Sequence, residues 1–375
     1  MLKVHLVDTT LRDGEQAPGV VFTPLQRLEL ARRLAVCGVA EIESGTPAMG
    51  VAEQAALREL NLAGLPVRLT AWCRATKDDL DAARVCGYRS VHISLPASPI
   101  LLDAMGRDEE WVFQTLEELL PELGNWADFI SVGAQDASRT NTSMLIRFAQ
   151  KAQQLGADRI RLADSVGCWN PETVAKVVRS VRTAVPDIRL GVHMHNDLGM
   201  ATANSITAVQ NGATDVDVTV NGLGERAGNA PLEQVVMALR TLPEFDHGIR
   251  TESLYSLCKA TACCSGRDIP LAQPITGDEV FRHESGIHVR ALLKDRRSYE
   301  PFDASAVGRS SQLDIQAGKH SGRAAIEHLF REQGMELPQE DVGGMLEQVR
   351  AQSEKLGRGL SRAELLAVFV EGQSK

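Results

Sequence analysis

Two kinds of hydrophobic pattern alternate along the first 242 residues. Short runs that are apolar or alternate between apolar and polar residues predict strands, and stretches with apolar residues every three to four positions predict amphipathic helices. The expected strands are 3–8, 39–44, 67–73, 89–94, 127–133, 158–163, 188–194 and 215–220. The expected helices are 24–37, 50–62, 77–86, 109–123, 141–155, 171–184, 199–211 and 231–240. Eight regular strand–helix units over about 240 residues favour a closed (β/α)8 TIM barrel over a doubly wound open sheet.

The pattern changes after about Pro243. Residues 250–300 read as short helices and loops, and the remainder reads as three helices, at Ser321–Glu332, Pro338–Leu356 and Ser361–Gly372. We therefore predict a catalytic barrel over residues 1–245, a lid or linker region over 246–302 and a small C-terminal helical domain over 303–375.

Composition narrows the class of protein. The net charge of −9 disfavours nucleic acid or an anionic membrane surface as a main partner, because no basic stripe offsets it. Small anionic substrates remain compatible, since local arginines matter more than the total charge. No apolar run approaches the ~20 residues that cross a bilayer, and the chain starts directly in a strand without a signal-peptide pattern. Seven cysteines without a C-x-x-C pair indicate reduced thiols and a cytoplasmic protein.

The stretch Asp8–Gln16 follows the first expected strand. Arg12 and Asp13 lie just past the carboxyl end of that strand, where barrel enzymes place their chemistry. Asp13 could hold a metal ion, and Arg12 could stabilise a developing oxyanion. A loop salt bridge with a helix cap is the alternative, and for these nine residues alone it is the better interpretation.

The His193-Met194-His195 sequence changes that balance. Side chains alternate along a strand, so both imidazoles leave the seventh strand on one side. The first and seventh strands flank the eighth in a barrel, which brings Asp13 to the same mouth. Two imidazoles and one carboxylate leave coordination positions open, as catalytic metal sites do. Asn196 and Asp197 follow and could orient the imidazoles.

Three further features lie near the expected mouth. The glycines of the loop after the eighth strand lack the spacing and acidic partner of a dinucleotide fingerprint, so they serve either a phosphorylated ligand or a tight turn; Asn229 beside them is a candidate oxygen ligand. Glu43, which ends the second strand, points at the mouth or forms a cap or salt bridge. His288 and Tyr299 could form a proton-transfer pair if their segment closes over the barrel.

Four motifs together resemble a known family: D-T-T-L-R-D-G-E-Q, H-x-H-N-D-x-G-x-A-T-A-N, N-G-L-G-E-R-A-G-N and H-E-S-G-I-H. They are similar to those of the acyl-CoA-dependent condensing enzymes of the α-isopropylmalate synthase and homocitrate synthase group. The resemblance implies a metal-dependent barrel and a helical linker that reaches into the partner subunit of a homodimer with shared active sites. It implies a divalent ion (Mg, Mn, Zn or Co) held by Asp13, His193 and His195, with Asn229 as a further candidate.

The same resemblance implies roles for other residues. Arg12 would face the keto oxygen of the substrate, and Gln16 and Glu43 would line the pocket. His288 and Tyr299, entering from the neighbouring subunit, would take part in deprotonating the acetyl group.

Within the group, the resemblance is greatest to the nitrogen-fixation type of homocitrate synthase. It is carried by the segments at 71–74, 94–96, 136–139 and 308–310. A hydroxymethylglutaryl-CoA lyase would have a Gly-Cys-rich loop at 224–229, and isopropylmalate synthases usually have a C-terminal regulatory domain for which this chain leaves no room. We expect condensation of acetyl-CoA with 2-oxoglutarate and water to homocitrate and CoA, for the nitrogenase cofactor. The alternatives are (R)-citramalate or 2-isopropylmalate synthesis and, in another class, a non-catalytic metal- or metabolite-binding barrel.

One departure from the family concerns substrate binding. Lysine-pathway homocitrate synthases have R-F-S-x-E-D where this chain reads Ser-Val-Gly-Ala-Gln-Asp at 131–136. The residue that holds the distal carboxylate of the keto acid is therefore open, with Arg74 and Arg161 as candidates. Ser165 is a further candidate substrate contact, at a position where the family often has threonine.

Overall fold

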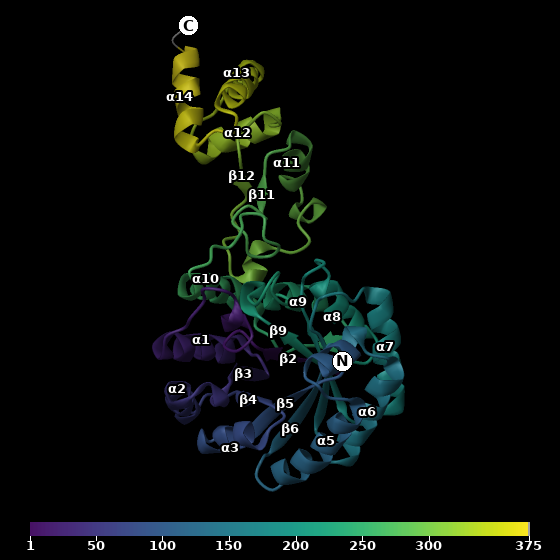
Figure 1. Ribbon diagram of the computed structural model, residues 1–375. Coiled ribbons are helices and arrows are strands. Elements are labelled where there is room, and N and C mark those ends of the chain that lie inside the picture. The colour runs from purple at the N-terminus through teal and green to yellow at the C-terminus, as the bar shows by residue number, and fades with distance from the viewer. Residues whose placement is uncertain (374–375) are drawn as a thin grey trace. The chain divides into compact units, whose positions relative to one another are not determined.

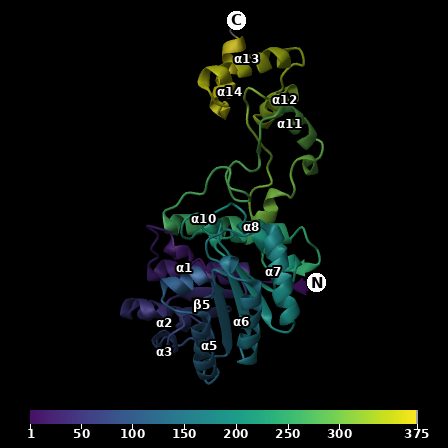
Figure 2. The same ribbon diagram turned by 45° about the vertical axis from the view of Figure 1, so that its right-hand side comes forward.

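The computed structural model describes residues 1–373, which form two compact units, one from Met1 to Ile269 and the other from Pro270 onward. The first unit is a closed barrel of eight parallel strands surrounded by helices (Figures 1 and 2), which confirms the predicted fold. The strands are β2 (His5–Asp8), β3 (Glu41–Gly45), β4 (Arg68–Arg74), β5 (Ser90–Pro96), β6 (Phe129–Gln135), β7 (Arg159–Asp164), β8 (Arg189–Met194) and β9 (Asp215–Val218). The β9–β2 pairing closes the barrel, with His5 opposite Asp215 and Asp8 opposite Val218.

A helix follows each strand of the barrel. These helices are α1 (Pro24–Cys37), α2 (Val51–Leu62), α3 (Lys77–Val85), α5 (Glu109–Leu123), α6 (Thr142–Gln154), α7 (Pro171–Ala184), α8 (Ala201–Gln210) and α9 (Leu232–Leu239). The start of α1 shows why the sequence pattern located it well. Thr23 and Gln26 form a capping box and Pro24 occupies the first turn. The helix ends at Gly38, whose φ of 100° is left-handed and where a Cβ would lie 2.6 Å from the oxygen of Gly248.

Two details of the first unit differ from the sequence prediction. The expected strand at 3–8 is divided: Leu2–Lys3 is a separate strand, β1, which pairs with β10 (Phe245–Asp246), and only β2 enters the barrel. A short helix, α4 (Pro99–Ala104), was not expected; Ser98 caps it and Pro99 starts it. Helix α10 (Leu254–Ser265) belongs to this unit, and its Cys258 oxygen accepts a hydrogen bond from Asn221.

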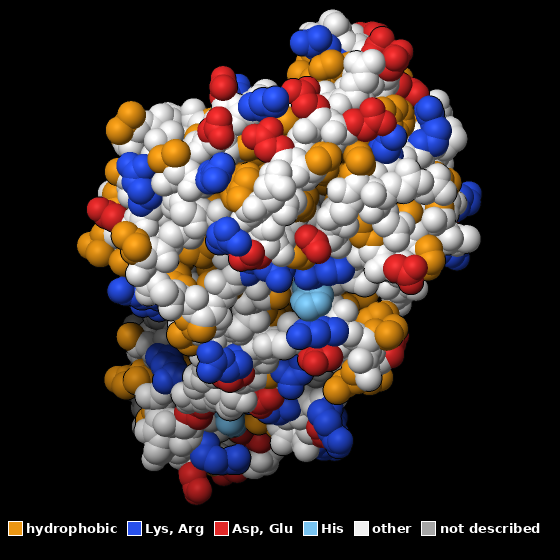
Figure 3. Space-filling model, turned by 90° about the horizontal axis from the view of Figure 1, so that it is seen from below, with side chains coloured by type: hydrophobic (Ala, Val, Ile, Leu, Met, Phe, Trp, Pro, Cys, Tyr) orange, Lys and Arg blue, Asp and Glu red, His pale blue; other side chains and the backbone are white. Residues whose placement is uncertain are grey.

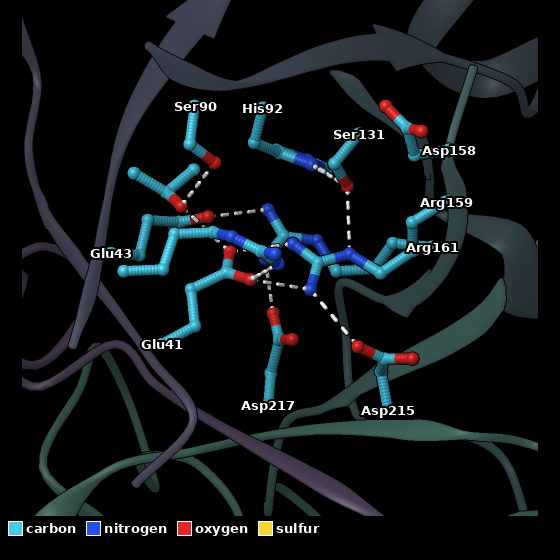
Figure 4. A network of polar contacts seen from close by, with 12 residues as sticks. Glu41, Glu43, Ser90, His92, Ser131, Asp158, Arg159, Arg161, Asp215 and Asp217 are labelled. Atoms are coloured by element: carbon cyan, nitrogen blue, oxygen red, sulfur yellow. Dashed lines mark hydrogen bonds and ion pairs between the residues drawn. The ribbon is translucent and has the colours of Figure 1, made fainter. Parts of the chain in front are cut away.

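Charged and polar side chains, not aliphatic ones, fill much of the barrel interior. As in other barrels of this type, alternate strands contribute to common layers. The lower layer, nearer the amino-terminal ends of the strands, contains Glu41, Ser90, Arg159 and Asp215. The upper layer, nearer the carboxyl ends, contains Glu43, His92, Arg161 and Asp217 (Figure 4). Arg159 is fully buried, and its guanidinium donates to Glu41 at 2.8 Å and to Asp215 at 3.1 Å. Every charge in these layers has an opposite partner, which is what makes their burial tolerable.

The second unit is mainly helical. It contains α11 (Gly286–Leu292), α12 (Arg323–Glu332), α13 (Asp341–Leu356) and α14 (Arg362–Gln373), together with the two-stranded sheet of β11 (Arg282–His283) and β12 (Asp314–Ile315). Its core is formed by apolar residues such as Val289, Ile326 and Phe330. The last three helices confirm the predicted C-terminal helices to within three residues. The assignment of 246–302 as a lid or linker stays a prediction.

The exterior of the described part of the chain shows charge of both signs and no apolar span. No helix within residues 1–373 combines the length and apolar character of a membrane span. On the face drawn in Figure 3, side chains of both charges are interspersed. That face, as far as the structure describes it, presents no continuous basic stripe.

Candidate active site

The loop after β2 presents Arg12 and Asp13 at the carboxyl end of the barrel. Asp8 initiates the loop by accepting hydrogen bonds from the backbone and hydroxyl of Thr10, and Leu11 anchors it with a fully buried side chain. Arg12 then lies between two carboxylates: its Nη1 is 2.5 Å from Asp13 Oδ1, and its Nε is 2.6 Å from Glu43 Oε1. The guanidinium is thus held in one orientation.

Asp13, His193 and His195 form a compact cluster, as the sequence predicted. One potential ligand atom from each lies within 4.8 Å of the others. The Nε2 atoms of the two histidines are 3.4 Å apart, and Nε2 of His193 is 3.6 Å from Asp13 Oδ2. Two imidazole nitrogens and a carboxylate oxygen that converge in this way are the donor set of an open divalent-metal site.

An unsatisfied polar atom also fits a metal at this cluster. Asn229 Oδ1 is buried and has no hydrogen-bond partner among the described residues. Asn229 lies beside Asp13, to which its Nδ2 donates at 2.6 Å, because the loop after β9 pairs with the chain at His195. A buried acceptor without a partner is costly, and a bound cation would satisfy it.

Burial and charged neighbours shift the pKa values of all three cluster residues. Burial alone would raise the pKa of Asp13, but the Arg12 guanidinium and His193 hold it well below its usual range. Burial opposes protonation of His193, yet hydrogen bonds to Asp13 and Asp217 raise its pKa to about 9. Burial and the neighbouring His193 lower the pKa of His195 to about 4. At neutral pH His193 is therefore an imidazolium and His195 a neutral imidazole, and a metal ion that binds His193 has to displace a proton from it.

The partner that orients His193 is Asp217, which the sequence analysis missed. His193 Nδ1 is 3.0 Å from Asp217 Oδ2. The residues expected in this role have other partners: Asn196 Oδ1 accepts from the Ala201 backbone, and Asp197 pairs with Arg226. The signal for Asp217 was present as an acidic residue at an inward-facing position of β9, two residues after Asp215.

A cavity of 260 Å³ opens beside the cluster. Its lining includes seven of the residues expected from the sequence: Arg12, Asp13, Gln16, Arg161, Ser165, His193 and His195. The rest of the wall was not expected and contains Trp72, His92, Ser94, Gly133, Gln135, Ala163, Glu225 and Arg226. Burial and the nearby arginines, Arg161 first, keep the pKa of His92 well below its usual value, so this imidazole is neutral. A second cavity of 470 Å³ shares Arg12 and Gln16 with the first.

Other predicted residues have different surroundings. Glu43 is fully buried behind the wall and binds Arg12 and Arg161. Arg74 lies outside the cavity lining; its side chain is 65% exposed and pairs with Asp79. His288 and Tyr299 belong to the second unit, where their rings stack with centroids 4.0 Å apart.

The glycine loop after β9 is a tight turn. At Gly228, with a φ of 80°, a Cβ would lie 1.9 Å from the oxygen of Gly222. The glycines therefore allow a close backbone approach that places Asn229 next to Asp13. This geometry accounts for them without a phosphorylated ligand.

Comparison with known proteins agrees with this geometry. Residues 3–260 match the HMGL-like family, and residues 275–356 match the homocitrate synthase post-HMGL domain-like family. The chain is 41% identical to 2-isopropylmalate synthase 2 of Caldanaerobacter subterraneus subsp. tengcongensis, over 99% of this chain and 97% of that protein. It is also 41% identical to homocitrate synthase 1 of Nostoc sp., over 99% and 98% of the two chains.

A solved hydroxymethylglutaryl-CoA lyase from Pseudomonas aeruginosa shares the fold, with a TM-score of 0.64 and 22% identity over 71% of this chain and 94% of the other. The chain therefore belongs to the HMGL-like family and, within it, to the condensing synthases that include homocitrate and isopropylmalate synthases.

Proposed function

We propose that this enzyme is a homocitrate synthase, which condenses acetyl-CoA with 2-oxoglutarate and water to give homocitrate and CoA. The observation that carries the proposal is the cluster of Asp13, His193 and His195 beside Arg12, in a cavity of a size suited to a small 2-oxo acid. Homocitrate synthases are among the relatives at 41% identity. From the family resemblance, we propose that the product serves the nitrogenase cofactor and that the enzyme acts in the cytoplasm.

We propose that Asp13, His193 and His195, with Asn229, hold a divalent ion. Such an ion supplies Lewis-acid polarisation of a carbonyl when bound. Arg12, fixed between Asp13 and Glu43, presents its guanidinium to the keto oxygen and stabilises the alkoxide that forms there. Gln16 and Ser165 contact the substrate from the cavity wall.

The polar wall supports 2-oxoglutarate over 2-oxoisovalerate. His92, Ser94, Gln135 and Ser165 line the cavity and offer hydrogen bonds to a distal carboxylate. A branched aliphatic side chain would leave these groups without partners, which a polar site discriminates against strongly. Neutral donors of this kind take the place of the arginine that lysine-pathway enzymes have near residue 131.

For proton removal from the acetyl group, we propose His288 and Tyr299 of a neighbouring copy in a homodimer. The stacked rings keep an imidazole and a phenol together, which suits a proton-transfer pair. The apolar cavity next to Arg12 has room for the thioester end of acetyl-CoA.

The test is CoA release from acetyl-CoA with 2-oxoglutarate, 2-oxoisovalerate and pyruvate, measured side by side and with the products identified by mass spectrometry. We expect the highest kcat/KM with 2-oxoglutarate. A preference for 2-oxoisovalerate or pyruvate would replace the proposal with isopropylmalate or citramalate synthesis. Unchanged CoA release by an Asp13→Ala/His193→Ala double variant would contradict the catalytic role of the cluster, and absence of CoA release with all three 2-oxo acids would instead indicate a non-catalytic barrel.

A further inference from the structure

A closed ring of alternating charges links the candidate metal ligands to Arg12. In order, the ring passes through Asp13, Arg12, Glu43, Arg161, Asp217 and His193, and then returns to Asp13. These side chains come from the loop after β2 and from β3, β7, β9 and β8. The ring therefore joins parts of the chain that are far apart in sequence.

Arg161 is the member that spans the barrel interior. Its Nη2 donates to Glu43 Oε2 at 2.9 Å and its Nη1 to Asp217 Oδ2, and the side chain is only 3% exposed. Figure 4 shows Arg161 extending from its strand toward Glu43 and Asp217. Because one planar guanidinium contacts both carboxylates, it fixes their separation.

Each of those carboxylates in turn orients a group at the candidate site. Glu43 holds Arg12 through Nε at 2.6 Å, and Asp217 holds His193 through Nδ1 at 3.0 Å. With Nδ1 engaged by Asp217, Nε2 of His193 is directed toward Asp13. A hydrogen bond on the second imidazole nitrogen is the usual way in which a protein fixes the orientation of a ligating histidine.

We propose that Arg161 is a positioning residue, which bridges Glu43 and Asp217 and thereby holds His193 and Arg12 in their functional orientations. This inference rests on the proposed metal site. It assigns to Arg161 a role other than binding the distal carboxylate of the keto acid, since two of its nitrogens are already occupied by protein carboxylates.

The direction in which metal affinity changes when Arg161 is removed distinguishes a positioning role from simple charge repulsion. A guanidinium near the site repels a divalent cation, so its removal would tighten metal binding if charge alone mattered. If the bridge matters, its removal releases Asp217 and His193 and weakens metal binding. Loss of a residue that hydrogen-bonds to a metal-ligating side chain typically weakens metal affinity by about 10- to 100-fold.

The experiment measures the Kd of the full chain for Mn²⁺ by isothermal titration calorimetry, and for Co²⁺ by its absorption spectrum. We expect Arg161→Met to weaken Mn²⁺ binding by about 10-fold or more and to alter the Co²⁺ spectrum. Arg161→Lys retains the charge but cannot contact both carboxylates as a planar fork, so we expect weaker binding there as well. Unchanged or tighter Mn²⁺ binding in both variants would overturn the proposal.

Arg189→Met is the matched control. Arg189 also pairs with a buried aspartate, Asp215, but in the lower layer and outside the ring. We expect Arg189→Met to lower the thermal midpoint of unfolding and to leave the Kd for Mn²⁺ unchanged. A loss of Mn²⁺ affinity in Arg189→Met equal to that in Arg161→Met would show that general loosening of the barrel, not loss of the bridge, is responsible. The titrations need no substrate, so an error in the assigned 2-oxo acid would not affect their outcome.

Discussion

Replacement of Gly133 by alanine tests whether the polar wall of the cavity selects the 2-oxo acid. A Cβ at this position would lie 2.6 Å from His92 Nε2 and 2.8 Å from its Cε1. Ordinary contacts begin near 3.5 Å, so the imidazole has to move by about 1 Å. Its Nδ1 is held by Ser131 Oγ at 2.8 Å, and Ser131 in turn accepts from Arg159, so this movement breaks a buried hydrogen bond.

The expected magnitudes follow from this clash. Overpacking of a buried position costs about 1–3 kcal/mol of stability. A displaced His92 also reduces the space and hydrogen bonding offered to the distal end of the substrate. We therefore expect kcat/KM for 2-oxoglutarate to fall by about 10- to 200-fold. Pyruvate has no distal carboxylate, so we expect its kcat/KM to change little.

The assay compares kcat/KM for the two 2-oxo acids in the same preparation, because their ratio is independent of the fraction of folded enzyme. His92→Ala provides the control background: without the imidazole, the alanine methyl group has nothing to displace. An equal loss for both substrates, or the same loss in the His92→Ala background, would refute the reasoning.

Three other predictions concern the metal, the shared site and a buried carboxyl group. Removal of divalent ions by a chelator should abolish CoA release and Mn²⁺ should restore it; activity that persists after exhaustive chelation would contradict the metal site. Mixing inactive His288→Ala and Asp13→Ala variants should restore part of the activity once subunits exchange, whereas no recovery despite demonstrated exchange would contradict shared sites. Burial raises the pKa of Asp8 from 3.8 to about 7, so the folded protein holds a proton that the unfolded chain releases, and this contribution to stability is lost as pH rises from about 4 to 7. Asp8→Asn keeps the contacts to Thr10 without that pH dependence. In urea unfolding, the free energy of unfolding of Asp8→Asn should rise relative to that of the wild type by up to about 3 kcal/mol between pH 5 and pH 8. A difference between the two proteins that stays constant with pH would contradict the assignment.

The barrel could be predicted because its elements carry local signals. Each strand–helix unit repeats the change from short apolar runs to helical spacing, and caps such as Thr23 with Pro24 mark where helices begin. The division of the first strand could not be predicted in this way. Leu2–Lys3 lies outside the barrel because it pairs with Phe245–Asp246, more than 200 residues away.

The cluster of Asp13, His193 and His195 was predictable, and the contacts that orient it were not. Asp13, His193 and His195 lie at the ends of strands whose order in a barrel is known in advance. Arg161 contacts both Glu43 and Asp217, and its contact with Glu43 crosses the barrel between residues 118 positions apart. Nothing local reports such a pairing. The spacing of two like charges two residues apart on β3, β7 and β9 is the signal that could have indicated inward-facing charged layers.

The charged layers of the barrel interior also constrain how this chain can diverge. Loss of Arg159 alone would remove the fully buried cation that Glu41 and Asp215 share, and would leave Glu41 with the part-exposed Arg68 and Asp215 with the part-exposed Arg189. Removal of one partner from a buried ion pair typically costs about 3–5 kcal/mol. Replacement of all three by apolar residues of similar volume carries no such penalty. Descendants of this protein should therefore retain or exchange the members of each layer together, and homologues that lack one of them should lack its counterparts on the opposite strands.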